Sequence, residues 1–375
     1  MIKEYLKKIF RNIAYSFFFI VHGTIENSIK CSKDNRIKVK TINIQKQLGY
    51  NVYIISSGRL YTDRIQDTAA ILDNKIIEEP SFQLRKKSGA QIFNSNIKNN
   101  IVFTKGTPRK LRILNGTVLS LLTGGAGNHN YWHWLFDVLP RFGLCGKATN
   151  LSEIDYFLLP SLLKNFQKET LDCLNIPAYK IISSEKFRHI KAKELIITDH
   201  PVMISGNATK DIQNIPDWIS IWLKNNFLNQ NTTINKTVKN KIYIDRSETN
   251  SKRLPQRTII NEDEIKKYLV KNNFKIVKLH KTKFIDQVDL FCNAECVVGL
   301  HGGGFGNIVF CRPKTKIIEL KNTTSGDAIK NLAQKNDLSY ISIEVEAKEI
   351  YKFQFPNQQG SIQIPISSLI KVIEN

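Results

Sequence analysis

The sequence predicts an α/β protein with two domains. Its 375 residues are more than one hydrophobic core usually serves. From residue 241 onwards, apolar strand-like runs alternate with amphipathic helical stretches, a pattern typical of a doubly wound parallel sheet. The glycine-rich segment 302–306 directly follows one apolar run and precedes another. Ligands of such sheets bind beyond the carboxyl ends of the strands, so this segment marks an expected ligand site.

Composition and charge narrow the classes of partner. The chain is 42% hydrophobic and 23% charged, as ordinary globular proteins are. Its formal charge of +22 indicates anionic partners, such as nucleic acid, an anionic membrane surface or phosphate-bearing substrates. Basic residues are spread along the chain, without the block that a nucleic-acid-binding arm shows, so we expect no nucleic acid partner. A basic nucleic-acid-binding protein remains the alternative from another class. Six irregularly spaced cysteines form no zinc or disulfide framework, which predicts a reducing compartment.

Residues 1–40 are expected to form a basic, apolar N-terminal arm. Lys3, Lys7 and Lys8 precede an apolar run at 13–21 that is too short to cross a bilayer. One interpretation is an amphipathic helix that lies on an anionic membrane surface. The other is a terminal helix packed on the body of the protein. The first would make this a cytoplasmic protein, peripheral on the inner face of the membrane.

Residues 41–227 are expected to form the first α/β domain. Residues 52–122 are rich in strand-like runs, with a hairpin that turns at Asp73 and Asn74. Apolar strands and helical stretches then alternate, and residues 216–227 form an amphipathic helix. The polar residues 228–240 are expected to be the linker between the domains.

Residues 241–346 are expected to form the second, Rossmann-like domain. Helix 261–274 begins at Asn261, with Glu264 in the position of a capping box. Residues 347–375 form a tail that we expect to cross back to the first domain. The other expected strands and helices of this domain lie at residues 241–246, 275–279, 284–293, 296–300, 315–320, 327–334 and 339–345.

Four polar residues at a spacing of four form the candidate catalytic face. A helix would place His129, His133, Asp137 and Arg141 on one side. In the catalytic interpretation, Asp137 orients His133, which accepts a proton. A metal site made of His129, His133 and Asp137 is one alternative, and a solvated helix face is another. No further His or Cys cluster accompanies these residues, so we expect no metal.

The candidate anion site follows the strand that ends at residue 300. Glycines allow close approach of the backbone to a ligand, and N–H groups at the start of the next helix suit an anion. Arg246, at the end of another strand, is expected to clamp a phosphate, and Glu319 to accept ribose hydroxyl groups. The alternative for the glycines is an ordinary tight turn. For Arg246 it is a surface charge, and for Glu319 a strand residue that faces solvent. The expected donor-binding residues are Arg246, His301, Gly302, Gly303, Gly304, Asn307 and Glu319.

Four segments together resemble the family-61 glycosyltransferases of bacterial polysaccharide biosynthesis. They read NYWHWLFDVLPR, IYIDR, NEDE and LHGGGFGNIVFCRPKTKIIEL, in that order between residues 124 and 320. The order and spacing of four motifs are more specific than any single one. Two departures stand out: Gly303 replaces the usual alanine, and Phe305-Gly306 replaces Leu-Thr. The second removes a hydroxyl group that would touch a phosphate.

The resemblance implies a GT-B-like fold, in which two Rossmann-like domains face a central cleft. It implies an inverting glycosyltransferase of the capsule or cell envelope type that moves a sugar from a nucleotide-sugar to a hydroxyl group of a surface polysaccharide, glycan or lipid-linked glycan. No cofactor or metal is expected. A related alternative is transfer of a non-glycosyl group, such as pyruvyl, onto a polysaccharide. The expected catalytic residues are His133 and Asp137, with Asp137 as the second candidate for the base, and the expected acceptor-side residues are Tyr131, Trp132 and Arg141.

Overall fold

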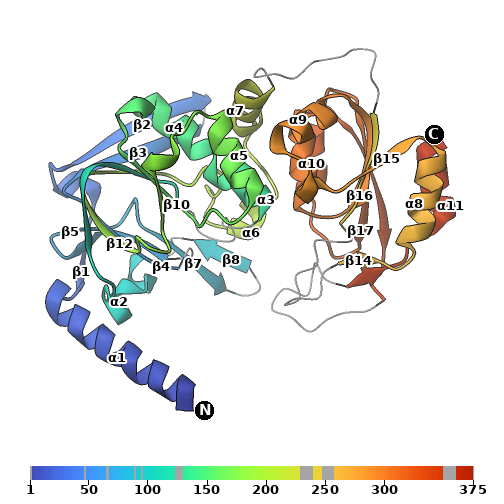
Figure 1. Ribbon diagram of the computed structural model, residues 1–375. Coiled ribbons are helices and arrows are strands. Elements are labelled where there is room, and N and C mark those ends of the chain that lie inside the picture. Colours follow the sequence, from blue (N-terminus) through green and yellow to red (C-terminus); the bar gives the residue numbers. More distant parts are fainter. Residues whose placement is uncertain are drawn as a thin grey trace. The chain divides into compact units, whose positions relative to one another are not determined.

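The chain folds into two compact units. The first consists of Met1–Lys164 and Asn175–Ile212, and the second of Asn165–Leu174 and Gln213–Asn375. The computed structural model describes residues 2–45, 48–64, 67–87, 90–93, 96–122, 130–228, 240–246, 257–348 and 360–374 (Figure 1). Residues 229–239 of the expected linker lie outside the described residues, as do residues 123–129, which include His129.

Helix α1 (Ile2–His22) begins the first unit, with the N-terminus at its free end (Figure 1). Its last turn contacts the unit: the ring of His22 lies edge-on to that of His189, with 4.9 Å between their centroids. Gly106 has a φ of +60°, and a Cβ atom there would lie 3.3 Å from the ring of Phe19. Among the described residues, no helix is both long enough and apolar enough to cross a membrane.

One mixed sheet contains the strands of the first unit that the structure describes, and those of the part that comes first in the chain pair antiparallel, except that β1 lies parallel to β6. Asp73 and Asn74, with φ values of 46° and 57°, form the two-residue turn between β5 and β6, so the predicted hairpin is confirmed. The strands of this part are β1 (Asn27–Ile29), β2 (Ile37–Gln45), β3 (Leu48–Ser56), β4 (Arg59–Arg64), β5 (Asp67–Leu72), β6 (Lys75–Ile77), β7 (Phe82–Lys87) and β8 (Ala90–Phe93).

The parallel part of this sheet positions the first candidate site. Strands β12 (His189–Thr198), β9 (Arg112–Ser120), β10 (Tyr156–Leu159) and β11 (Ile181–Ser183) lie side by side in that order. All three pairings are parallel. The chain leaves β9 towards β10 and returns on the other side of β9 as β12. A crevice therefore forms beyond the carboxyl ends of β9 and β12, where ligands of doubly wound sheets bind.

A continuous helical segment follows β9 and passes through a wide turn. It consists of α3 (Tyr131–His133), the π-helical turn η3 (Trp134–Val138) and α4 (Pro140–Ala148). Asn130 caps it by accepting a hydrogen bond from the Trp132 amide at 3.0 Å. The Leu139 amide reaches back five residues to the Trp134 carbonyl at 3.1 Å. Pro140 then begins α4, where its missing N–H group is tolerated. π-helical turns of this kind are frequent at functional sites.

The second unit is built on a five-stranded parallel sheet, as the sequence predicts for this part of the chain. The spatial order is β15 (Phe274–Val277), β13 (Asn240–Ile244), β16 (Ala294–Leu300), β17 (Lys316–Asn322) and β18 (Ser339–Val345). In chain order this is 2-1-3-4-5, so the switch point lies between β13 and β16. Arg246 follows β13 and His301 follows β16.

Short elements complete the two units. Asn261 precedes α8 but does not cap its amides: its side chain binds Glu264 and the Ile364 carbonyl, which ties α8 to the C-terminal segment. Leu369 of α11 is buried in the core of the second unit. The remaining elements are α2 (Val102–Lys105), α6 (Ala208–Asp211), α5 (Asn165–Cys173), α7 (Asp217–Phe227), α8 (Glu262–Lys271), α9 (Phe284–Cys292), α10 (Ala328–Lys335), α11 (Ile366–Glu374), the pair β14 (Thr258–Ile259) and β19 (Ser361–Ile362), and the 3₁₀ segments η1 (Cys31–Lys33), η2 (Ile97–Asn99), η4 (Leu151–Glu153), η5 (Ala178–Lys180), η6 (Leu279–Lys281) and η7 (Gly303–Phe310).

Candidate functional site

His133 and Asp137 form a hydrogen-bonded pair at the wide turn of the first unit. The Nδ1 atom of His133 lies 2.6 Å from Oδ2 of Asp137, whose side chain is 1% exposed. The imidazole is 14% exposed, so the ring is mostly buried but in part open to solvent. Because Nδ1 is held by the carboxylate, Nε2 is the atom that can accept a proton. Burial opposes a charge on His133, but the charge and hydrogen bond of Asp137 prevail and raise the pKa of His133.

His200 lies against the same carboxylate and was not predicted from the sequence. Its Nε2 atom is 4.0 Å from Oδ2 of Asp137. Its Nδ1 atom accepts hydrogen bonds from the amides of Val202 and Met203, at 3.1 and 2.9 Å, which leaves the ring proton on Nε2. Burial lowers the pKa of His200 to about 3, so the ring is neutral. The sequence feature that could have pointed to His200 is its position directly after an apolar strand-like run, the run that forms the end of β12.

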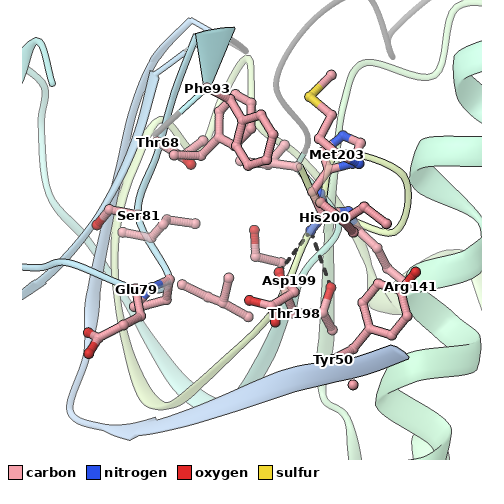
Figure 2. Close-up of a pocket in the computed structure, with 18 residues that line it drawn as sticks. Tyr50, Thr68, Glu79, Ser81, Phe93, Arg141, Thr198, Asp199, His200 and Met203 are labelled. Atoms are coloured by element: carbon pink, nitrogen blue, oxygen red, sulfur yellow. Dashed lines mark hydrogen bonds between the residues drawn. The ribbon is translucent and has the colours of Figure 1, made fainter. Parts of the chain in front are cut away.

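Arg141 joins the helical segment to β12. Its Nε atom donates to the Asp137 carbonyl at 3.1 Å, and Nη1 donates to the carbonyl and hydroxyl oxygens of Thr198 at 3.1 and 3.2 Å. The side chain is buried, and burial lowers its pKa to about 10, so it remains a cation at neutral pH. It lines a cavity of about 350 Å³ in the first unit (Figure 2).

The other residues expected near the acceptor have different surroundings. Trp132 is buried and packs on Phe136, with ring centroids 4.6 Å apart, so it belongs to the core. Tyr131 is half-buried at the start of α3. His129, the third ligand of the alternative metal site, lies outside the described residues.

Two arginines converge on the switch point of the second unit. Nη1 of Arg246 donates to the His301 carbonyl at 2.6 Å, and Nη1 of Arg257 donates to the same oxygen at 3.1 Å. Burial lowers the pKa of both guanidinium groups, that of Arg257 to about 10, and both remain cations at neutral pH. Two cations beside the start of η7 suit a phosphate-bearing ligand. Arg257 was not singled out in the sequence.

The glycines of this segment make room for the protein's own groups. A Cβ atom at Gly302 would lie 2.4 Å from Nη1 of Arg246, so the missing side chain is the space that the guanidinium occupies. A Cβ atom at Gly304 would lie 2.9 Å from Cδ1 of Leu279. Gly303, between them, opens η7.

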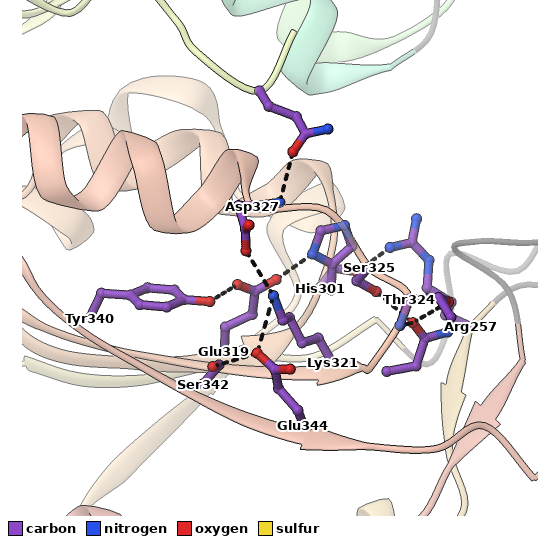
Figure 3. A network of polar contacts seen from close by, with 12 residues as sticks. Arg257, His301, Glu319, Lys321, Thr324, Ser325, Asp327, Tyr340, Ser342 and Glu344 are labelled. Carbon is purple, nitrogen blue, oxygen red and sulfur yellow. Dashed lines mark hydrogen bonds and ion pairs between the residues drawn. The ribbon is translucent and has the colours of Figure 1, made fainter. Parts of the chain in front are cut away.

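Glu319 holds His301 in place. It is fully buried, with one oxygen bound to Nδ1 of His301 and the other accepting from the Tyr340 hydroxyl at 2.5 Å (Figure 3). Because Glu319 is fully buried and both of its oxygens are bonded to protein groups, the structure favours an orienting role for it. Burial outweighs the charge of Glu319 and lowers the pKa of His301, which favours its neutral form. Lys321 lies nearby, 3.3 Å from Asp327.

Asn307 is an internal support of η7. Its side chain is fully buried, and Nδ2 donates to Oε1 of Gln287 at 2.9 Å. Of the expected donor residues, Arg246, His301 and Gly302 therefore meet at the strand ends, while Asn307 and Glu319 are buried around them.

One comparison with known protein families covers the part of the chain that contains both sites. A family model described as Glycosyltransferase 61 matches residues 131–318, half of the chain. The chain belongs to the glycosyltransferase 61 family. It is therefore an enzyme that acts on a sugar donor and an acceptor. The match begins at the start of α3 and ends within β17, so it spans both the His133–Asp137 pair and the arginine cluster. A comparison of this glycosyltransferase with curated proteins finds no match.

Proposed function

We propose that this glycosyltransferase moves a sugar from a nucleotide-sugar to a hydroxyl group of a surface glycan, with inversion at the anomeric carbon. The observation that carries the proposal is the contact of 2.6 Å between His133 and the buried carboxylate of Asp137. Such a pair suits a base that must accept a proton near neutral pH, because the carboxylate fixes the ring and stabilises the imidazolium that forms.

The chemistry requires one displacement step. Nε2 of His133 takes the proton of the acceptor hydroxyl while its oxygen bonds to the anomeric carbon. The bond between that carbon and the diphosphate oxygen breaks at the same time, and the nucleoside diphosphate leaves with the electron pair. Asp137 holds the ring through Nδ1 and balances the positive charge that forms on it.

The donor is assigned to the second unit. Arg246 and Arg257 both reach the His301 carbonyl, which places two positive charges at the end of β16. Charge develops on the leaving diphosphate in the transition state, so positioned cations accelerate the reaction. In this proposal the two units are the acceptor-side and donor-side halves of a GT-B enzyme.

Substitution of the base tests the proposal. His133→Ala should lower kcat by about 100-fold or more, since base catalysis contributes roughly 10²- to 10⁴-fold, while donor affinity stays near that of the parent. Asp137→Asn should lower kcat less, because the imidazole remains. The assay is nucleoside diphosphate release over a panel of nucleotide-sugars and glycan acceptors, with His280→Ala, an exposed histidine of the second unit, as the control.

Two outcomes would change the assignment. If His133→Ala keeps most of its turnover while Asp137→Asn loses nearly all of it, the aspartate is the base. If both variants keep full activity, the helical segment is structural and the proposed chemistry is refuted.

Helix α1 supports attachment of this enzyme to a membrane surface. Leu6, Phe10, Ile13 and Phe17 are between 58% and 75% exposed, at a spacing that forms one apolar stripe. Lys3, Lys7 and Lys8 lie on the N-terminal half of the same helix. An exposed apolar stripe with basic neighbours is typical of helices that lie in the headgroup region of anionic membranes. We infer that α1 holds the enzyme at the inner face of the membrane, where a lipid-linked or growing capsular glycan would be its acceptor.

A further inference from the structure

The cavity of the first unit lies at the switch point of the parallel strands. Its walls include Ser120, the last residue of β9, and Thr198, the last residue of β12. Arg141 and His200 form one wall, and Thr68, Ser81 and Glu79 the opposite one (Figure 2). With a volume of about 350 Å³, it is at the lower end of the range for ligand sites, which suits a ligand of one ring.

Buried polar groups with unused hydrogen-bonding capacity line this cavity. Arg141 binds protein oxygens through Nε and Nη1, whereas Nη2 has no hydrogen bond to the residues that the structure describes. Nε2 of His200 is buried and also makes no hydrogen bond to them, with Oδ2 of Asp137 lying 4.0 Å away. Asp199 accepts from the Asn51 amide at 2.7 Å and from the Tyr53 hydroxyl at 2.8 Å, one on each oxygen, so each oxygen can accept another bond.

Carboxylates outnumber cations around the cavity. The cation of Arg141 lies near the carboxylates of Asp137 and Asp199, and burial raises the pKa of Asp199. Glu79, which is exposed, adds a carboxylate to the wall. No surplus of positive charge is present to compensate an anion, so a neutral ligand with hydroxyl groups fits these donors and acceptors best.

Aromatic rings supply an apolar surface beside the polar groups. Phe82 and Phe93 both line the cavity and stack with 6.1 Å between ring centroids and 10° between planes. Sugars present hydroxyl groups at their edge and C–H groups on their faces, so a wall with both aromatic and polar groups matches a saccharide.

We propose that this cavity binds one neutral sugar residue of the acceptor glycan, with Arg141 donating to its hydroxyl groups and Asp199 accepting from them. The proposal rests on the proposed function, because it assigns the ligand to the acceptor. Arg141 also binds the Asp137 carbonyl, so one side chain connects this cavity to the helical segment that carries the proposed base.

Binding of free sugars by the full chain, without donor, tests the inference directly. Saturation-transfer NMR would be recorded with glucose, galactose and N-acetylglucosamine, and with glucuronic acid as the anionic counterpart. Ile204→Trp fills the cavity from a lining position that is 50% exposed, and Ile221→Trp is the matched control on α7, at 55% exposure. A milder variant, Thr68→Val, removes one hydroxyl group of the lining and keeps the shape of the side chain.

We expect at least one neutral sugar to bind the parent and Ile221→Trp equally, with at least tenfold weaker binding to Ile204→Trp and weaker binding to Thr68→Val. Glucuronic acid should bind the parent at least tenfold more weakly than its neutral counterpart. The inference is overturned if the parent binds none of these sugars, if Ile204→Trp binds them as the parent does, or if the acid binds more tightly. Nucleoside diphosphate release by the parent and by Ile221→Trp over the donor and acceptor panel assesses the proposed function separately from sugar binding in this cavity.

Discussion

Mild acid should destabilise the first unit, because two of its histidines are buried in the neutral form. Burial lowers the pKa of both His189 and His200 to about 3. In the unfolded chain each would titrate near pH ~6.5. Their folded pKa values are lower than the unfolded ones, so the unfolded state binds more protons below pH ~6.5 and stability falls as the pH falls.

The size of the effect follows from proton linkage. Between pH 7 and 5.5, each such histidine lowers the free energy of unfolding by about 1.2 kcal/mol, provided that its folded pKa lies below about 4.5. The two together give about 2.4 kcal/mol. His133 acts in the opposite direction, because its pKa is raised in the folded state and its contribution is lost as the pH rises. It offsets at most about 0.8 kcal/mol over this interval, so a net loss of stability remains.

Urea unfolding of the parent and of His200→Asn at pH 7.0 and 5.5 would measure how much His200 contributes to the loss of stability in acid. Asparagine does not titrate, and its side-chain oxygen can accept the amides of Val202 and Met203 as Nδ1 of His200 does. The loss of unfolding free energy between the two pH values should be about 1.2 kcal/mol smaller in the variant. Equal losses in the two proteins would refute the neutral, buried state of His200.

Three further outcomes are expected. The kcat of the parent should fall as the pH falls through the raised pKa of His133, because the base must be neutral. In Asp137→Asn this fall in the pH profile of kcat should occur at lower pH. An unchanged profile would count against the His133–Asp137 pair. Gly302→Ala should displace the guanidinium that occupies its space and weaken nucleotide-sugar binding about tenfold, roughly 1.4 kcal/mol, in calorimetric titrations; unchanged affinity would place the phosphates elsewhere. In co-sedimentation with anionic vesicles, Phe10→Glu should release the protein, whereas Ile113→Glu, at a similarly exposed position of β9, should not. High salt should also release the parent. Equal binding of both variants would contradict the membrane assignment.

Local patterns in the sequence predicted the features that are set by residues close together in the chain. The turn at Asp73 and Asn74 and the strands of the second sheet follow from residue type and periodicity. The contact between His133 and Asp137 follows from a spacing of four on a helix. No pattern in the sequence, however, indicated that the parallel and antiparallel strands of the first unit would join in one mixed sheet.

The surroundings of the sites depend on contacts that no spacing reveals. His200 meets Asp137 from 63 positions further along the chain, because β9 and β12 are paired. Glu319 was expected to face the ligand, whereas its oxygens are bound by His301 and Tyr340. Burial and strand order decide which polar group meets a substrate and which one supports it, and neither can be read from one residue type at one position.

Strand β12 connects the N-terminal helix to the helical segment that carries His133 and Asp137. It begins at His189, which contacts His22 of α1, and ends at Thr198, which binds Arg141. Ten residues of β-strand span about 30 Å. With α1 in the headgroup layer, this length sets an upper limit on the height of the bound acceptor above the lipids. A short saccharide on a lipid carrier stands within that height, whereas the far end of a long polymer reaches the site only by folding back to the membrane.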